Sequence, residues 1–349
     1  PMSFTFLDDP VEATDLGARL ESEDRIALDC EAAGFHRYSD RLCLVQLSTR
    51  DGNWILDPLA FDPAPVLRPV LEDPETEVVM HGADFDVRLL DRDLDIQLRG
   101  LFDTQAAAAL LGVRSLGLQS LLEEFLDVHA SKKYQRADWA KRPLPDEMLA
   151  YAASDTSHLL ELADLLGNRL REKGRLAWAH EEFRELEGVR WEEDAEEDPV
   201  TRVKAARRME PREVAALREA LEWRDRIARE RDRAPFRVAG DNALVAAVRT
   251  RPGSVDELSS VQGMSGRLAR DEGADLLDRF ERVARMDEDE IVPYPPPPEN
   301  GSDRPSREVQ DRQRELKSVR NSKSDELGID RGTLLPNAVL LEIARRTPA

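Results

Sequence analysis

The sequence has 349 residues, of which 41% are hydrophobic and 35% are charged, and its formal net charge is −21 at pH 7. This length suits two or three domains, and no run of 18 uninterrupted apolar residues is present that would suggest a transmembrane helix. Taken alone, this acidity argues against a nucleic-acid-binding protein, because contacts to phosphate need Lys and Arg.

The charge is unevenly distributed along the chain. Residues 201–285 contain 19 Lys and Arg and 15 Asp and Glu, a net charge of +4, so the remaining residues carry −25. Only 7 of the 50 basic residues are Lys. Such acidity with few lysines fits an adaptation to high salt, and it fits a solvated acidic surface without special meaning equally well.

Four short apolar runs in the first 100 residues have the length and composition of β-strands. They cover residues 25–31, 42–47, 54–56 and 76–80. From residue 103 to residue 174 the apolar spacing is mostly helical. Strands followed by helices around one mixed sheet predict a three-layer α/β domain.

The second half of the chain is predicted to be helical. Pro211 opens a long helix that runs to about Arg231, and further helices are expected near residues 241–250, 254–260 and 265–285. We therefore divide the chain into a first domain over 1–190, a linker over 191–209, a helical domain over 210–286, a Pro-rich linker over 287–305, and a helical segment over 306–349.

The last segment shows a weak similarity to the helical domain. The stretch from Leu221 to Leu244 resembles the stretch from Leu316 to Leu340, although the spacing slips by a residue and few identities hold. We interpret this segment as a partial second copy of the module that stops at half its length.

Candidate metal ligands begin in the first strand. Asp29 and Glu31 flank Cys30, and alternate residues of a strand share a face, so the two carboxylates point the same way. Adjacent carboxylates repel unless a cation lies between them, and Mg²⁺ and Mn²⁺ prefer oxygen ligands. An Asp-x-Glu pair by itself also fits a solvated edge strand.

Two further acidic elements follow. Asp84 and Asp86 lie where the fourth strand gives way to a helix, and either could face a cleft above the sheet; Asp84 also suits the N-cap of that helix. Tyr151 and Asp155 are four residues apart in a predicted helix and so share one face, although a helical Tyr is commonly a residue at the edge of a core.

In this order, these elements resemble the DEDD exonuclease superfamily, in its tyrosine-bearing branch, and the ribonuclease D family in particular. The resemblance covers most of residues 20–170. The matching motifs are Leu28-Asp29-Cys30-Glu31, Leu44-Val45-Gln46-Leu47, Asp57-Pro58-Leu59, His81-Gly82-Ala83 with Asp86, Leu101-Phe102-Asp103-Thr104, Asp138-Trp139, Arg142-Pro143-Leu144, and Tyr151 with Asp155.

The resemblance implies a ribonuclease H-like fold and a 3′→5′ exoribonuclease that uses two divalent cations, Mg²⁺ or Mn²⁺. It assigns the cations to Asp29, Glu31, Asp86 and Asp155, which leaves Asp84 as the helix cap. It makes Tyr151 the residue that orients the attacking water or accepts its proton, and the ordinary tyrosine pKa near 10 favours the orienting role. The expected product is a nucleoside 5′-monophosphate, and the expected substrate is RNA, with transfer-RNA precursors as the family expectation.

Several side chains near the proposed site are expected to contact RNA. Arg37, Lys132, Lys133 and Arg136 are basic and lie in the matched segments, whereas His36 and Tyr38 fit either nucleotide contacts or plain loop surface. The helical domain resembles the helicase-and-RNase-D C-terminal (HRDC) module through Leu221-Glu222-Trp223-Arg224-Asp225, Pro235-Phe236-Arg237-Val238, Asn242-Ala243-Leu244 and Gly263-Met264-Ser265. Its net positive charge agrees with a role in binding nucleic acid, and the alternative is a helical spacer.

Two rival interpretations remain at this point. One is a DNA 3′→5′ exonuclease; the other is a non-catalytic RNA-binding or scaffold protein, against which the clustered carboxylates speak. The two cysteines, Cys30 and Cys43, are too few for a disulfide framework or a four-ligand zinc site, and the first residues show no signal-peptide pattern. We expect a cytoplasmic protein with no membrane attachment.

Overall fold

The computed structural model describes residues 3–193, 197–296 and 305–346. The chain divides into two compact units. Unit 1 comprises Pro1–Ala33, Arg41–Trp191 and Arg304–Ala349, and unit 2 comprises Gly34–Asp40 and Glu192–Asp303. None of the helices in these described ranges is long and apolar enough to cross a membrane.

Unit 1 is built on a mixed six-stranded sheet with the order β1-β4-β3-β2-β5-β6. The antiparallel β2, β3 and β4 form the centre, and parallel pairing adds β1 at one edge and β5 and β6 at the other. The strands are β1 (Thr5–Leu7), β2 (Arg25–Ala32), β3 (Leu42–Ser48), β4 (Asn53–Leu56), β5 (Glu77–Met80) and β6 (Leu101–Asp103). Every residue of β3 is buried, including the polar Gln46 and Ser48, as expected for a central strand that is covered on both faces.

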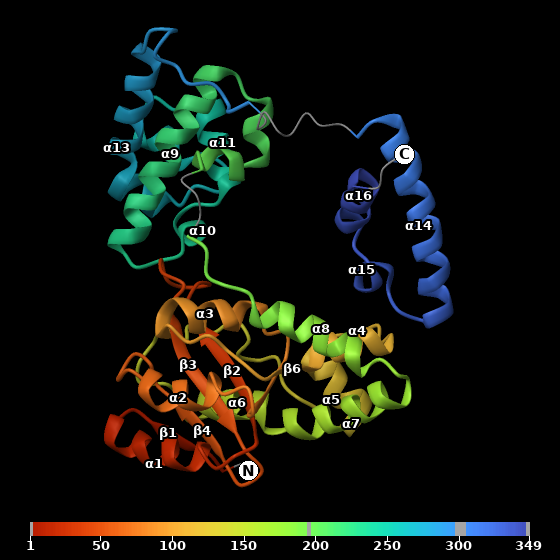
Figure 1. Ribbon diagram of the computed structural model, residues 1–349. Coiled ribbons are helices and arrows are strands. Elements are labelled where there is room, and N and C mark those ends of the chain that lie inside the picture. Colours follow the sequence, from red (N-terminus) through yellow and green to blue (C-terminus); the bar gives the residue numbers. More distant parts are fainter. Residues whose placement is uncertain (1–2, 194–196, 297–304, 347–349) are drawn as a thin grey trace. The chain divides into compact units, whose positions relative to one another are not determined.

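Helices cover both faces of this sheet, which confirms the predicted three-layer α/β architecture (Figure 1). The apolar stripes of α1 and α2 pack on one face, together with Leu28, Cys30, Val45 and Leu47 of the central strands. Met148, Leu149 and Ala152 of α6 pack with Leu44 and Ile55 on the other. The helices of this unit, other than those near the C-terminus, are α1 (Pro10–Leu20), α2 (Ala64–Leu71), α3 (Asp84–Leu94), α4 (Thr104–Leu111), α5 (Leu118–Leu126), α6 (Asp146–Ser157), α7 (Leu159–Glu172) and α8 (Leu176–Glu187).

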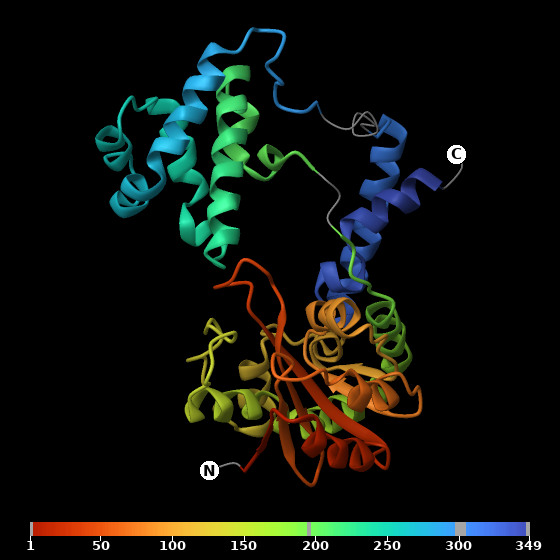
Figure 2. The ribbon, with the colours of Figure 1, turned by 90° about the vertical axis from the view of Figure 1, so that its left-hand side faces the viewer.

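Unit 2 is helical and has its own core. Figures 1 and 2 show its two longest helices, α9 (Pro211–Glu230) and α13 (Gly266–Arg285), side by side. The fully buried Trp223 of α9 donates its indole N–H to the carbonyl of Glu272 on α13, which joins the two helices at 3.0 Å. Three shorter helices complete the unit: α10 (Pro235–Val238), α11 (Asp241–Thr250) and α12 (Val255–Ser259).

The linker expected over residues 191–209 is shorter than predicted. Pro199–Arg202 and Lys204–Arg208 form two 3₁₀ helices, η1 and η2. Val200, Val203 and Ala206 are buried in the core of unit 2, so apolar packing and not chain flexibility determines their place. Residues 194–196, and residues 297–304 of the predicted Pro-rich linker, lie outside the described residues.

The C-terminal helices repeat the geometry of part of unit 2. Helices α14 (Arg307–Leu327), α15 (Arg331–Leu334) and α16 (Asn337–Arg346) each begin 96 positions after α9, α10 and α11. The same interval relates two largely buried arginines that make equivalent contacts. Arg224 donates to the carbonyl of Ala239 and to Asp241, and Arg320 donates to the carbonyl of Leu335 and to Asn337. The sequence comparison aligned identical residues, and the resulting intervals differ by one residue from place to place. The starts of the helices keep one constant interval of 96 positions.

Candidate active site

The first pair of candidate ligands lies on the central strand β2. Asp29 and Glu31 project from the same face of the strand, while Cys30 is buried in the apolar core on the opposite face. The ladder between β2 and β3 shifts register between Glu31 and Ala32. Irregularities of this kind interrupt pairing and re-aim side chains, and here the irregularity falls directly beside Glu31.

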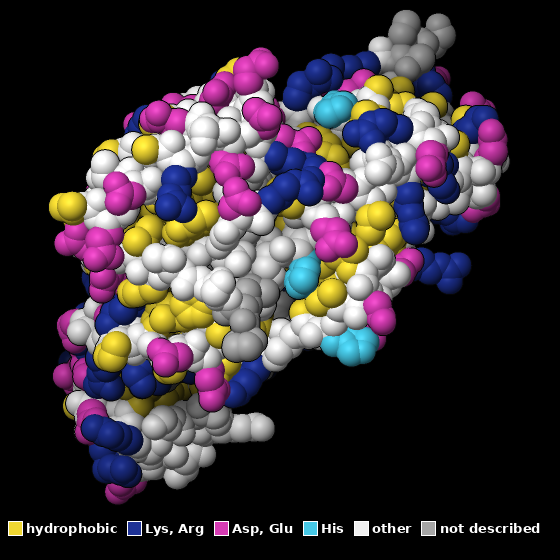
Figure 3. Space-filling model, turned by 90° about the horizontal axis from the view of Figure 1, so that it is seen from below, with side chains coloured by type: hydrophobic (Ala, Val, Ile, Leu, Met, Phe, Trp, Pro, Cys, Tyr) yellow, Lys and Arg dark blue, Asp and Glu magenta, His cyan; other side chains and the backbone are white. Residues whose placement is uncertain are grey.

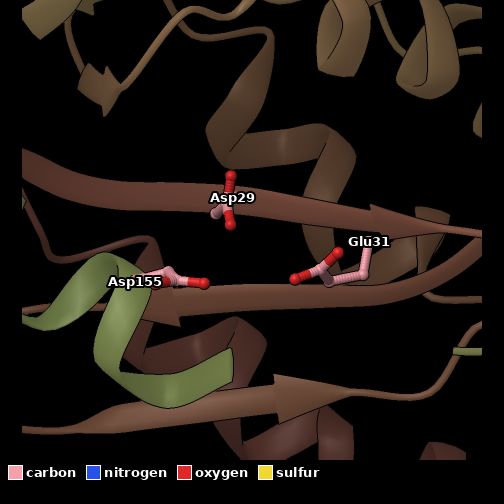
Figure 4. A group of neighbouring side chains, drawn as sticks. All are labelled: Asp29, Glu31 and Asp155. Atoms are coloured by element: carbon pink, nitrogen blue, oxygen red, sulfur yellow. The ribbon is translucent and has the colours of Figure 1, made fainter. Parts of the chain in front are cut away.

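Asp155 joins this pair from helix α6, which packs across β3 and β4. One carboxylate oxygen from each of Asp29, Glu31 and Asp155 lies within 4.8 Å of the others, and Figure 4 shows the three carboxylates facing the same space. Tyr151 lies one turn earlier on α6 and forms a side-chain hydrogen bond with Asp155. The spacing of four residues therefore brings the hydroxyl and the carboxylate together.

Asp86 is the fourth carboxylate of this group. It is buried on α3, with 7% of its surface exposed, and it interacts electrostatically with Asp29 and Glu31. The prediction that Asp84 caps this helix was wrong. The N-cap position is Ala83, and Asp84 is the first helical residue, with an exposed side chain paired to Arg88 at 3.1 Å. Asp103 of β6 holds the helix start instead, because its carboxylate accepts the backbone N–H of Ala83 at 2.7 Å.

Burial and mutual repulsion make the charged form of these carboxylates unfavourable. Burial raises the pKa of Asp29 to about 7, and burial followed by the charge of Asp29 raises the pKa of Asp155 to about 8. Burial, and then neighbouring carboxylates, raise the pKa values of Glu31 and Asp86 well above their ordinary range.

Among the described residues, no Lys or Arg forms an ion pair with this group. In the described part of the chain, none of Asp29, Glu31, Asp86 and Asp155 takes part in an ion pair. Four oxygen-bearing acids without a cationic side chain are the donor set that suits Mg²⁺ or Mn²⁺, and a bound divalent cation would relieve the repulsion that raises their pKa values. The residues therefore fit a divalent metal site.

Aromatic side chains pack around Tyr151. The ring of Tyr134 meets it edge-on with centroids 5.8 Å apart, and the ring of Trp139 stacks on it at 6.2 Å. The hydroxyl of Tyr134 donates to Glu147 at 2.7 Å, and the ammonium of Lys133 contacts the same carboxylate at 2.8 Å. Tyr134 was not singled out from the sequence; an aromatic residue within a basic loop was the available signal.

The basic loop that contains the predicted RNA contacts is anchored by one arginine. Arg142 donates to both carboxylate oxygens of the buried Asp57, at 2.6 and 2.7 Å, and to the carbonyls of Cys43 and Trp139. This bidentate contact fastens the segment after α5 to the end of β4. Lys132, Lys133 and Arg136 are exposed on that segment, where they are accessible to a polyanion.

His36, Arg37 and Tyr38 lie in the segment Gly34–Asp40, which belongs to unit 2, whereas the residues of the carboxylate cluster belong to unit 1. There the hydroxyl of Tyr38 donates to Asp225 at 2.9 Å, and Arg37 lies 3.6 Å from Asp232. Arg237 approaches the ring nitrogen of His36 at 3.5 Å. Their role in RNA binding stays a prediction.

A partly buried acidic cluster on a mixed sheet, one helix turn from a tyrosine, together with a separate helical unit, is typical of a class of nucleases. A family model described as 3′-5′ exonuclease matches residues 4–171, and one described as HRDC domain matches residues 213–279. These two matches assign an exonuclease domain to the first half of the chain and an HRDC domain to unit 2.

Relatives of known name support this assignment. The chain is 33% identical over 278 residues to ribonuclease D of Pseudomonas paraeruginosa, which covers 78% of this chain and 74% of that protein. It is 33% identical over 271 residues to ribonuclease D of Escherichia coli K12, which covers 77% and 72%. The chain therefore belongs to the ribonuclease D family, and it is a 3′→5′ exoribonuclease. The crystal structure of Escherichia coli RNase D gives a TM-score of 0.71 at 28% identity and covers 100% of this chain and 92% of that one. The catalytic core of RRP6 from Trypanosoma brucei gives a TM-score of 0.73 at 32% identity, covering 81% and 80%.

Proposed function

We propose that this chain shortens RNA from its 3′ end by a two-metal reaction in which Asp29, Glu31, Asp86 and Asp155 hold the cations. The observation that carries the proposal is the convergence of the oxygens of Asp29, Glu31 and Asp155 within 4.8 Å without a cationic partner among the described residues. When bound, two such ions stabilise the attacking and leaving oxygens of an in-line displacement at phosphorus.

Tyr151 is proposed to orient the attacking water. Burial, followed by the charges of Asp155, Glu31 and Asp29, raises the pKa of Tyr151 above its ordinary value. The phenol therefore stays protonated at neutral pH, so that it can hold a water molecule through a hydrogen bond and is poorly suited to act as a general base. Its hydrogen bond to Asp155 and the rings of Tyr134 and Trp139 restrict where the hydroxyl can lie.

RNA binding is proposed to involve two basic regions. Lys132, Lys133 and Arg136 would contact the backbone near the reacting end, and residues 201–285, with a net charge of +4, would hold RNA farther from it. The crystal structure of the Escherichia coli relative is described as an exoribonuclease involved in structured RNA processing. We propose structured RNA, with transfer-RNA precursors as the first candidate, as the substrate here, and the cytoplasm as its place of action.

One assay tests this function directly. The full chain is incubated with 3′-labelled and 5′-labelled RNA and with matched DNA, in Mg²⁺, in Mn²⁺ or in EDTA. We expect the 3′ label to be released first as a nucleoside 5′-monophosphate, the 5′ label to shorten stepwise, and EDTA to stop both. Release from the 5′ end, or full activity in EDTA, would contradict the proposal, and a marked preference for the DNA strands would assign the enzyme to DNA instead.

A further inference from the structure

A buried glutamine beside the carboxylate cluster has no side-chain hydrogen bond to any described residue. Gln46 is on β3, directly opposite Asp29 in the antiparallel ladder. Residues directly opposite each other in such a ladder project from the same face, with Cβ atoms about 4.5–5.5 Å apart. The side chain of Gln46 is fully buried, yet neither its amide nitrogen nor its amide oxygen has a hydrogen-bond partner among the residues that the structure describes.

The residues on either side of Gln46 on this face of β3 both have identified contacts. Leu44, two residues earlier, packs in the apolar cluster beneath α6. Ser48, two residues later, shares a hydrogen bond of 2.7 Å with Thr156 of α6. Helix α6, which carries Tyr151 and Asp155, contacts both β2 and β3, so it covers the face on which Gln46 and Asp29 lie opposite each other.

An unpaired amide in this position is costly for the fold. Buried polar groups in native proteins are nearly always hydrogen-bonded, because burial removes their bonds to water. A leucine or valine, the residue types found at 44, 45 and 47, would fill such a position without that cost. The presence of glutamine is therefore best explained by a partner that the bare cluster does not supply.

We propose that Gln46 is a positioning residue for the metal site, and that its amide N–H donates to the carboxylate of Asp29 when divalent cations are bound. The inference rests on the proposed two-metal function. A neutral donor suits this place because an arginine or lysine would compete with the cations for the same carboxylates, whereas an amide orients the ligand without adding charge. Hydrogen bonds of this kind to metal-binding side chains fix their orientation.

The test compares Gln46→Met with Ser48→Ala in the full chain. Methionine has a similar length and no hydrogen-bonding amide, and Ser48 is a matched buried polar residue on the same face of the same strand. We expect Gln46→Met to weaken Mn²⁺ binding by about 10- to 100-fold in titration calorimetry, with a melting temperature of the metal-free protein equal to or above that of the wild type. Ser48→Ala should lower the melting temperature and leave Mn²⁺ affinity unchanged.

Wild-type Mn²⁺ affinity in Gln46→Met would overturn the inference, and so would an equal loss of affinity in both variants, which would trace the effect to packing. If the wild-type chain itself bound no Mn²⁺, the two-metal function would fail instead, so the two failures are distinguishable. Should Gln46→Met not fold, the side-chain amide NMR signals of the eight glutamines are compared with and without Mg²⁺ in the wild type. One amide should shift and become protected from exchange, and an unchanged set would refute the proposed hydrogen bond.

Discussion

The carboxylate cluster of unit 1 and the helices of unit 2 differ in whether their charged side chains form ion pairs. In unit 2, Arg226 contacts Glu230, Glu272 and Asp275 at 2.9 to 3.3 Å, and Arg279 contacts Glu219 at 2.9 Å. In the cluster of unit 1, four carboxylates lie together with no arginine or lysine paired to them in the described structure. The helices of unit 2 thus neutralise charge within the chain, whereas the carboxylate cluster has the donor set that suits a divalent cation.

In its mixture of acidic and basic side chains, the outer surface of unit 1 resembles unit 2 more than it resembles the carboxylate cluster. Figure 3 shows acidic and basic side chains interspersed over the face seen from below. Ion pairs between exposed side chains of this kind contribute little to the free energy of unfolding, about 0–1 kcal/mol each. The same residue types therefore form a solvated surface in one place and a partly buried group with raised pKa values in the other, and desolvation without a charged partner makes the difference.

The largest expected effect comes from removing one charge of the cluster. Asp29→Asn should reduce kcat by about 10³-fold or more, because a lost ligand removes several kcal/mol of transition-state stabilisation. It should also raise the melting temperature of the metal-free protein, because one repelling charge is gone. Single-turnover cleavage of a labelled RNA and thermal unfolding in EDTA measure the two effects. Asp84→Asn, which alters an exposed, arginine-paired carboxylate on α3, is the control and should retain wild-type kcat; near-wild-type rates for Asp29→Asn would remove it from the catalytic group.

Tyr151→Phe should have the next largest effect. Losing the water-orienting hydroxyl is expected to slow cleavage by about 10²-fold, while Mn²⁺ binding measured by calorimetry remains close to that of the wild type. Trp139 and Tyr134 can still pack on a phenylalanine ring, so the fold should persist. The loss of a metal site in Tyr151→Phe would show that the hydroxyl is needed for binding the cation and would contradict its assignment to the water.

The stability of the metal-free protein should depend on pH in the direction set by the cluster. The pKa of Asp29 is raised to about 7 and that of Asp155 to about 8, so the folded state holds protons that the unfolded chain has already released above about pH 4. The stabilising contribution of these protons is present at about pH 4 and is lost as pH rises through 7 to 8.

Chemical denaturation in EDTA between pH 4 and pH 8.5 measures this dependence. The loss of stability should be smaller in Asp29→Asn, and Mg²⁺ should offset most of it in the wild type at pH 8. The change in the free energy of unfolding between pH 4 and pH 8.5 is compared between the wild type and Asp29→Asn. If the wild type loses no more stability than the variant over this range, the four acids do not repel one another in the folded protein.

The smallest effects should separate free from paired arginines in unit 2. Arg233 is exposed and its side chain forms no ion pair within the described residues, whereas Arg226 is held by three acids. Arg233→Gln should weaken RNA binding a few-fold and reduce the salt slope of log K by about 0.7, the value for one phosphate contact on a single strand. Arg226→Gln should leave that slope unchanged and cost at most about 1 kcal/mol of stability. Equal salt slopes for both variants and the wild type would reduce unit 2 to a spacer.

Local features of this protein could be predicted from its sequence because they depend on periodicity. The two-residue alternation of a strand placed Asp29 and Glu31 on one face, and the helical repeat placed Tyr151 beside Asp155. Helix α11 covers the predicted residues 241–250, and α9 and α13 lie within one residue of their predicted limits. Capping and apolar spacing act over a few residues, so the sequence carries that information directly.

The tertiary structure alone decided which distant residues meet. That β2 and α6 bring their carboxylates within 4.8 Å, that Asp103 of β6 holds the start of the helix carrying Asp86, and that Gln46 faces Asp29 all follow from strand register and helix packing. The segment with His36 and Tyr38 likewise belongs to unit 2, although its neighbours along the chain form the catalytic sheet. Register and packing are set by the summed burial of many apolar side chains, and no short stretch of sequence contains that sum.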